Sequence, residues 1–278
     1  MQTAFHDILI HVRDFKQRTP AVEFGVQMAK AFDATVTGVY VCPERLYAAA
    51  SYGVAWVTDA MLESERQLVE DAIGAGATFR QWAAQQGVGH NGWLVAEAST
   101  GNALAQASMR HDLLVLDHSP EDRSGSAAEV SEVVLKTFTP CMVVPPGHGA
   151  FDGFTRIAIG WNGSPEAMRA VYAALPLLRG HDVLLMRGEE RMMTYRVDWH
   201  PPLDIVKYLN RYDVHVDEKA IDAGRDDVGA ALMETAAQYG ADLLVMGAYG
   251  RSRFSEWILG GATRDILASA SIPVLLRH

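Results

Sequence analysis

The sequence predicts an α/β protein built from two tandem doubly wound, Rossmann-like domains, each with a five-stranded parallel sheet flanked by helices. Three observations carry this prediction. Short apolar runs alternate with segments whose apolar residues recur at helical spacing. The pattern of the first half returns in the second half. The length of 278 residues also suits two domains of moderate size.

The first strand and the first helix of each half correspond. Residues 7–12 form an apolar run that is matched by residues 156–162. Residues 20–30 then parallel residues 165–175, and both segments begin with proline, whose missing N–H costs little at a helix start. Each half is therefore predicted to open with a strand followed by a helix.

The later elements of the two halves also correspond. Second strands are expected at residues 35–41 and 182–186. The clearest match is Asp-Leu-Leu-Val, which begins at Asp112 and again at Asp242 and is typical of a strand buried on both faces. Strands that alternate with helices imply right-handed crossovers and a parallel sheet covered on both faces.

Each half ends with a proline followed by an apolar run, at Pro140 and Pro273, and proline suits the first residue of a strand. A Pro-Pro-Gly sequence follows the first of these runs. We therefore expect an N-terminal domain at 1–146, a linker near 145–152 and a C-terminal domain at 153–278.

Composition excludes several classes of function. The formal net charge of −10 argues against a nucleic-acid backbone as the main partner, because such binders usually carry a basic face. An apolar fraction of 49% with 21% charged residues is ordinary for a globular protein with real cores. No apolar run reaches the length of a membrane span, and no signal sequence opens the chain. We therefore expect a cytoplasmic protein that binds no membrane.

Neither a disulfide framework nor a metal site is expected. Cys42 and Cys141 lie far apart, so both are interpreted as buried small apolar residues in a reducing compartment. Metal-capable groups occur at Asp198, His200, His215 and Asp217, but their spacing does not match a zinc motif.

A glycine-rich segment follows the buried run 242–246. Gly247 and Gly250 permit a close approach of backbone to a ligand, and a helix is predicted to begin near Gly260, after nine intervening residues. Free N–H groups and the positive end of the helix dipole favour an anion there, and the Thr263 hydroxyl adds a donor. The segment therefore predicts a phosphate cradle.

The order Gly-x-x-Gly-x9-Gly resembles the nucleotide-binding signature of the universal stress protein (UspA) family, which has Ser or Thr directly after the last glycine. Here Gly261 stands at that position, and Thr263 supplies a hydroxyl two residues later. The resemblance spans essentially the whole chain. It implies tandem HUP-type (adenine nucleotide alpha hydrolase-like) domains and a regulatory stress-response protein that binds ATP, ADP or AMP, with or without Mg²⁺, in its C-terminal domain.

The predicted cofactor-binding residues gather at the carboxyl ends of the strands, where open α/β sheets bind ligands. The family usually has Asp at the position of Asn162, whose amide still forms hydrogen bonds but brings no charge. A turn and helix cap at this position is a sound interpretation on its own, and it is compatible with a role in nucleotide binding. The Arg251 guanidinium is suited to binding phosphate, and an exposed charge in contact with solvent is the alternative interpretation. The full set is Trp161, Asn162, Met246, Gly247, Tyr249, Gly250, Arg251, Gly260, Gly261, Ala262 and Thr263.

The first half lacks this signature. Neither Gly247 nor Gly250 has a counterpart after its Asp-Leu-Leu-Val strand, where Asp117 with nearby acidic residues would repel a polyphosphate. Gly125 and Ser126 are interpreted as a helix N-cap rather than an anion site. The N-terminal domain is therefore expected to be a degenerate structural partner.

Two alternatives to a nucleotide sensor stay open. One is a scaffold that has lost nucleotide binding in both halves, in view of Gly261 and Asn162. The other is a slow ATPase or self-phosphorylating protein that uses Ser252 or Thr263, although the sequence contains no P-loop, hydrolase elbow or kinase signature. No catalytic residue is assigned. The halves are expected to form an intramolecular pseudo-dimer. A homodimer of two chains stays open, and so does the identity of a downstream protein partner.

Overall fold

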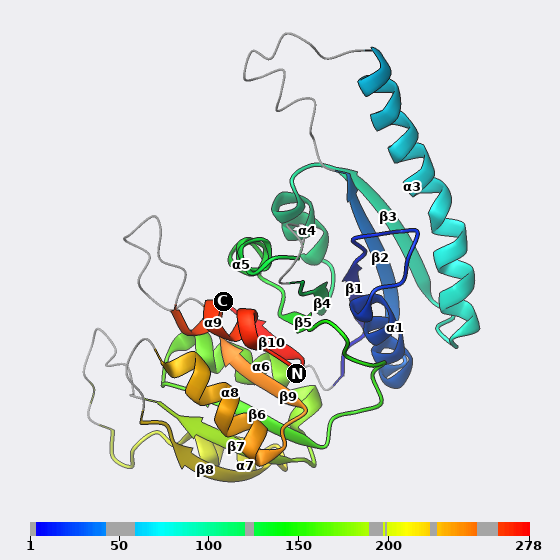
Figure 1. Cartoon of the computed structure of the whole chain (residues 1–278). Helices are drawn as coiled ribbons and strands as arrows, with labels where there is room; N and C mark the ends of the chain where they lie inside the picture. Colours follow the sequence, from blue (N-terminus) through cyan, green and yellow to red (C-terminus); the bar gives the residue numbers. More distant parts are fainter. Residues whose placement is uncertain are drawn as a thin grey trace.

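The computed structural model describes residues 4–42, 59–119, 125–188, 197, 199–222, 227–248 and 261–278. One sheet with helices on both faces runs through these residues (Figure 1). The first half contains β1 (Asp7–His11), α1 (Pro20–Phe32), β2 (Thr35–Cys42), α3 (Asp59–Gln85), β3 (Asn91–Glu97), α4 (Thr100–Ser108), β4 (Leu113–Asp117), α5 (Ala127–Lys136) and β5 (Cys141–Val144). The second half contains β6 (Arg156–Trp161), α6 (Pro165–Leu178), β7 (Asp182–Arg187), α7 (Ile205–Asn210), β8 (His215–Ala220), α8 (Val228–Tyr239), β9 (Leu243–Gly247), α9 (Gly261–Ser269) and β10 (Val274–Arg277).

The α/β class and the five parallel strands of each half are confirmed, but the two sheets are fused. The strand order is β3-β2-β1-β4-β5-β10-β9-β6-β7-β8, and only the β5 to β10 pairing at the centre is antiparallel. Val143 pairs with Val274, and Cys141 pairs with Leu276. Each of these strands is apolar and buried, so each satisfies the edge that the other half would otherwise expose.

The repeated Asp-Leu-Leu-Val sequence has a structural reason. The Asp112 carboxylate accepts hydrogen bonds from the N–H groups of His6 (2.7 Å) and Asp7 (3.1 Å), at the start of β1. In the second half the Asp242 carboxylate accepts from the N–H groups of Thr155 (2.6 Å) and Arg156 (3.1 Å), at the start of β6. Both aspartates therefore fix the register of the fourth strand beside the first.

Two apolar cores lie on opposite faces of the sheet. The first core includes residues of α1, α3, α6 and α7, and the second includes residues of α4, α5, α8 and α9. Both cores cross the junction between the halves, because Met142 and Leu275 belong to the first while Cys141 and Val274 belong to the second. The halves are therefore packed together as well as paired through their backbones.

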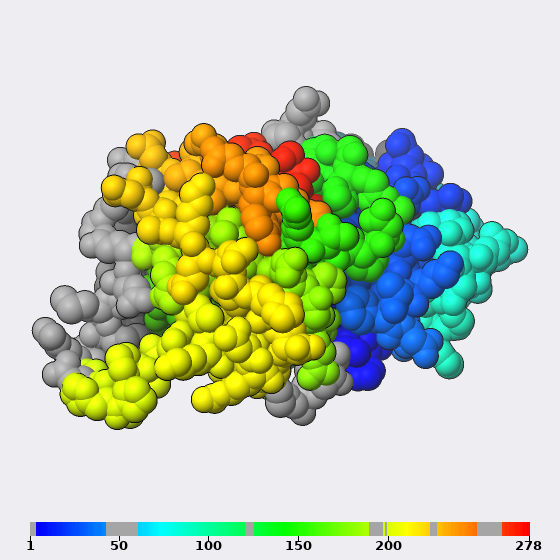
Figure 2. All heavy atoms as spheres, turned by 90° about the horizontal axis from the view of Figure 1, so that it is seen from below, coloured from blue at the N-terminus to red at the C-terminus, as the bar shows by residue number. Residues whose placement is uncertain are grey.

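The segment between β5 and β6 is packed against the first half. Phe24 of α1 contacts Phe151 at a ring-centroid distance of 5.2 Å, and Phe151 contacts Phe154 at 5.1 Å. In Figure 2 the green segments of the chain lie between the blue N-terminal half and the yellow and orange C-terminal half. The domain limits 1–146 and 153–278 remain our proposal.

The expected burial of the two cysteines is confirmed. Cys42 and Cys141 are both buried free thiols, and burial raises the pKa of Cys141 to about 11. No helix in the described part of the chain combines the length and the hydropathy that a bilayer crossing requires.

The end of β9 touches the backbone at the start of α6. A Cβ added to Gly247 would lie 2.4 Å from the nitrogen of Ala167 and 2.5 Å from the carbonyl carbon of Glu166. Such separations are far inside van der Waals contact, so only glycine permits this approach. Packing alone therefore explains Gly247, whether or not a ligand also needs it.

We expect Gly247→Ala to lower the free energy of unfolding by about 1–3 kcal/mol, because the new methyl group must push α6 away from the sheet. Urea unfolding measures this change. Gly149→Ala is the matched control, since a Cβ there meets no atom within 4 Å. Equal effects of the two substitutions would contradict the proposed contact.

Candidate functional site

The structure brings several of the predicted site residues to one edge of the sheet. β6 and β9 are neighbouring parallel strands, with Gly160 beside Met246, so Asn162, which follows β6, and Gly247, the last residue of β9, lie at the same edge of the sheet. Gly261 and Ala262 are the first residues of α9, which leads into β10 on the other side of β9. Four members of the predicted set lie outside the described residues: Tyr249, Gly250, Arg251 and Gly260.

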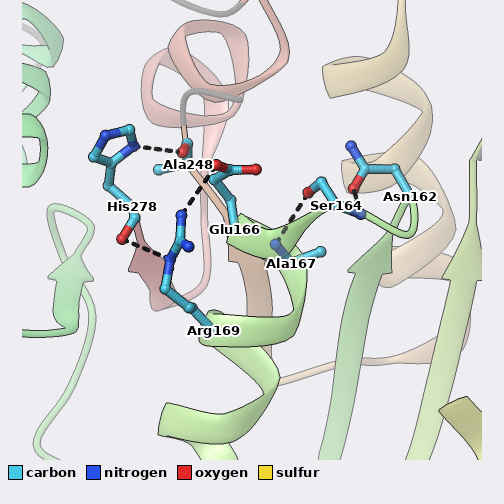
Figure 3. A network of polar contacts seen from close by, with 7 residues as sticks. All are labelled: Asn162, Ser164, Glu166, Ala167, Arg169, Ala248 and His278. Atoms are coloured by element: carbon cyan, nitrogen blue, oxygen red, sulfur yellow. Dashed lines mark hydrogen bonds and ion pairs between the residues drawn. The ribbon is translucent and has the colours of Figure 1, made fainter. Parts of the chain in front are cut away.

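The turn from β6 into α6 is built by side chains. The Asn162 Oδ1 accepts a hydrogen bond from the Ser164 N–H (3.1 Å), and the Ser164 Oγ accepts from the Ala167 N–H (3.1 Å; Figure 3). Gly163 between them has φ = 69°, and Pro165 is the first residue of the helix. The interpretation of this segment as a turn and helix cap is therefore confirmed.

Trp161 and Met246 have packing roles. The side chain of Trp161 is partly buried against the core on the α6 side, and its carbonyl accepts a hydrogen bond from the Gly188 N–H (2.9 Å). Met246 is buried in the opposite core. Any contact of these two residues with a ligand remains a prediction.

Thr263 is almost fully buried, with 3% of its surface exposed. It lies in the first turn of α9, one helical turn before the core residues Ile266 and Leu267. Its proposed contact with a phosphate remains a prediction. The burial means that shortening this side chain would disturb packing as well as remove a hydroxyl.

A polar network beside the site was not predicted from the sequence. Arg169 of α6 forms an ion pair with Glu166 (3.0 Å) and donates from Nε to the His278 carbonyl (3.2 Å). The His278 Nδ1 donates to the carbonyl of Ala248 (3.2 Å), the first residue after β9 (Figure 3). The only sequence signal was an acidic residue in the first turn of a helix, because the other partners are distant along the chain.

The corresponding edge of the first half is filled by its own side chains. The pairings of Ile8 with Leu113 and of Ile157 with Leu243 make Arg13 equivalent to Asn162 and Asp117 equivalent to Gly247.

Asp117 binds the start of α1. Its Oδ1 accepts from the Ala21 N–H (3.0 Å), and its other oxygen accepts from the Thr19 hydroxyl. The carboxylate is turned onto the helix start and is buried, and the repulsion of a polyphosphate by Asp117 remains a prediction. Burial raises the pKa of Asp117, and the two hydrogen bonds act in the opposite direction.

Arg13 covers the other side of this edge. A Cβ added to Gly125 would lie 2.5 Å from a guanidinium nitrogen of Arg13. The Ser126 hydroxyl accepts from the Glu129 N–H (3.3 Å) and caps α5, as predicted. In the first half the side chains of Arg13 and Asp117 therefore occupy this edge of the sheet.

Two histidines are buried beside this cluster. Burial lowers the pKa of His11 to about 4, with Glu129 opposing the shift and Arg13 adding to it. Burial and then Arg13 also lower the pKa of His118. Within the described residues no group of three or more His, Cys, Asp or Glu side chains is arranged to hold a metal ion.

The neutral His11 predicts a loss of stability in acid. Its folded pKa of about 4 lies below the ordinary value of 6.5, so the unfolded chain takes up a proton that the folded protein resists. The free energy of unfolding should fall as the pH drops from about 6.5 towards 4, by at most about 3 kcal/mol from this residue.

Urea unfolding of the native chain and of His11→Gln measures the effect. The two measurements are made at about pH 7, above this window, and at about pH 4.5, near its lower end. The other titrating groups are common to both proteins, so the difference isolates His11. An identical pH dependence in the two proteins would contradict the role given to His11.

Comparison with known proteins gives the family. The model of the universal stress protein family matches residues 4–145 and 206–278. A universal stress protein from Archaeoglobus fulgidus DSM 4304 is 13% identical with a TM-score of 0.73, covering 99% of this chain and 98% of that one. A functionally unknown protein from Pseudomonas aeruginosa PAO1 is 14% identical with a TM-score of 0.55, covering 99% and 93%. Such identities show the fold alone, and comparison with curated proteins found no match. Because the family model matches more than half of the residues, the chain belongs to the universal stress protein family.

Proposed function

We propose that this protein is a regulatory or sensor protein that binds ATP, or a related adenine nucleotide such as ADP or AMP, in its C-terminal half. The observation that carries the proposal is the meeting of three elements at one edge of the sheet: the ends of β6 and β9 and the start of α9. Open α/β sheets bind ligands beyond the carboxyl ends of their strands. Family membership supports an adenine nucleotide as that ligand.

The phosphates belong at the glycine sequence and the start of α9. Free N–H groups at a helix start favour anions, and Gly260 and Gly261 leave room for a close approach. Thr263 offers the nearby hydroxyl. Mg²⁺ would be held by the phosphates of the nucleotide and not by a set of protein ligands. The nucleoside then extends along the sheet edge towards Trp161 and Asn162.

A single nucleotide per chain follows from the difference between the halves. In the first half the Asp117 carboxylate occupies the start of α1, and Arg13 covers Gly125. The N-terminal half then acts as a structural partner. Binding would regulate the protein only to the extent that two states of the chain differ in their affinity for the nucleotide. We place this regulator in the cytoplasm, where it would act on a downstream protein.

A scaffold without nucleotide is the second candidate. Gly247 is explained by packing against α6, and the Asn162 oxygen is engaged in a turn, so neither residue needs a ligand to account for it. A slow ATPase or self-phosphorylating activity is a further alternative. Transfer of radiolabel from ATP to the protein would favour that activity over a sensor.

Calorimetric titration with ATP and Mg²⁺ tests the proposal. We expect a single site per chain, loss of binding in Gly250→Trp, and an affinity about 3- to 10-fold lower in Thr263→Val, which keeps the buried volume and removes only the hydroxyl. Gly149→Ala is the control and should bind as the native chain does.

Absence of ATP binding by the native chain would sink the nucleotide proposal in favour of the scaffold. Binding of a second nucleotide would show that Asp117 and Arg13 do not close the first half. Unchanged affinity in both site variants would show that the site lies elsewhere.

A further inference from the structure

The two outer strands of the fused sheet differ in charge. β8 ends the sheet on one side, and its exposed residues include Asp217, Glu218 and Lys219. Charged side chains on an edge strand oppose pairing with a further strand. β3 ends the sheet on the other side, and Glu97 is its only charged residue. β3 is therefore the edge that can accept another strand.

The backbone groups of β3 alternate in direction. At one end of the strand the Val36 N–H donates to the His90 carbonyl (3.0 Å), and at the other end the Ala98 N–H donates to the Cys42 carbonyl (3.3 Å). Even-numbered residues therefore direct their N–H and C=O groups at β2. The backbone groups of the odd-numbered residues, among them Val95, point away from β2, where no strand of the described chain pairs with β3.

An apolar groove lies beside this edge, between β3 and α3 (Figure 1). Trp93 packs beneath α3, and its Nε1 donates to the Ala72 carbonyl (2.8 Å). Val69 and Ile73 of α3 line the groove with Trp93 and Val95 of β3. The groove therefore runs along the backbone groups that point outward.

Apolar side chains are exposed on both faces of the edge. Ile73 is 61% exposed on the α3 face. Leu94 is 45% exposed and lies on the opposite face from Trp93, because successive side chains of a strand alternate. In Figure 2 the cyan atoms of α3 form the outermost part of the N-terminal half, so this edge is open to a large partner.

Opposite charges stand at the two ends of the groove. A Cβ added to Gly76 would lie 2.5 Å from the Trp93 ring, and α3 runs antiparallel to β3. Arg80 follows Gly76 by one helical turn, so it lies roughly 6 Å nearer to the start of β3. Glu97 is the last residue of β3. The groove is therefore complementary in charge to a reversed copy of itself.

We propose that this edge binds a second copy of the chain, with the two β3 strands antiparallel about a two-fold axis beside Leu94. Trp93 then pairs with Val95 of the second copy, and both residues have outward backbone groups. The two Ile73 side chains meet near the axis, and Arg80 faces Glu97 of the second copy. An extended segment of another protein could also add to an edge strand, but it would not require opposite charges at the two ends. A symmetric contact of this kind closes at a dimer.

Sedimentation equilibrium of the full chain without nucleotide tests the proposal. We expect a dimer of the native chain between about 1 and 100 µM, and a Kd at least about 30-fold higher for Ile73→Lys, which places two like charges near the axis. Met109→Lys is the matched control. Met109 is 64% exposed and precedes β4, three strands away from β3, so this variant should dimerise as the native chain does.

A proline substitution tests the strand pairing itself. Val95→Pro removes an N–H that points away from β2, so the chain should keep its fold and lose the dimer. Urea unfolding of the dilute monomer checks that the fold is kept. If Val95→Pro does not fold, Ile73→Lys and the charge reversals still decide.

Reversal of the charges tests the two-fold arrangement. Arg80→Glu and Glu97→Arg should each raise the Kd of the dimer about 3- to 10-fold, and the double variant should restore the native value. A native chain that stays monomeric at about 100 µM would overturn the inference and leave this edge to another protein. A dimer that Ile73→Lys does not weaken, or a double variant that restores nothing, would also overturn it.

Discussion

The two halves differ in what occupies the space between the end of the fourth strand and the start of the first helix. In the second half no side chain fits there, since a Cβ on Gly247 would lie 2.4 Å from the Ala167 nitrogen. In the first half the Asp117 carboxylate fills the equivalent space and accepts a hydrogen bond from the Ala21 N–H. At this one position the second half has a glycine, so that only backbone atoms line the edge of the sheet. The first half has Asp117, whose carboxyl group fills the edge.

The consequences of this difference extend to charge and burial. In the first half the Arg13 charge acts on the buried Asp117 carboxylate and on His11 and His118, and burial lowers the pKa of both imidazoles. Burying such groups costs free energy unless partners compensate for the lost water. In the second half Gly160 stands at the position of His11, and Asn162 uses only one side of its amide. Among the described residues the Asn162 Nδ2 therefore stays without a hydrogen-bond partner at this edge.

The sequence predicted the elements better than their partners. Apolar runs and prolines located the buried strands and the starts of α1 and α6, whereas β8 has mostly exposed, charged residues and lacks an apolar pattern. The antiparallel junction of β5 with β10 joins residues as far apart in the sequence as Cys141 and Leu276, which are separated by 135 positions. Asp117 binds Ala21, which lies 96 residues away. Such contacts arise only when the chain is folded, so a local pattern cannot reveal them.

The same contacts connect the candidate site with the junction between the halves. The carbonyl of Arg277 in β10 accepts from the Ala248 N–H at 2.8 Å, and His278 holds the Ala248 carbonyl. β10 also pairs with β5 of the first half. A ligand that shifts the chain after β9 would therefore also act on β10, which pairs with both halves. The two halves are coupled by the ligand only if the protein has two conformations that bind it with different affinity. The fused sheet therefore connects the first half to the candidate site through the pairing of β5 with β10 and of β10 with β9.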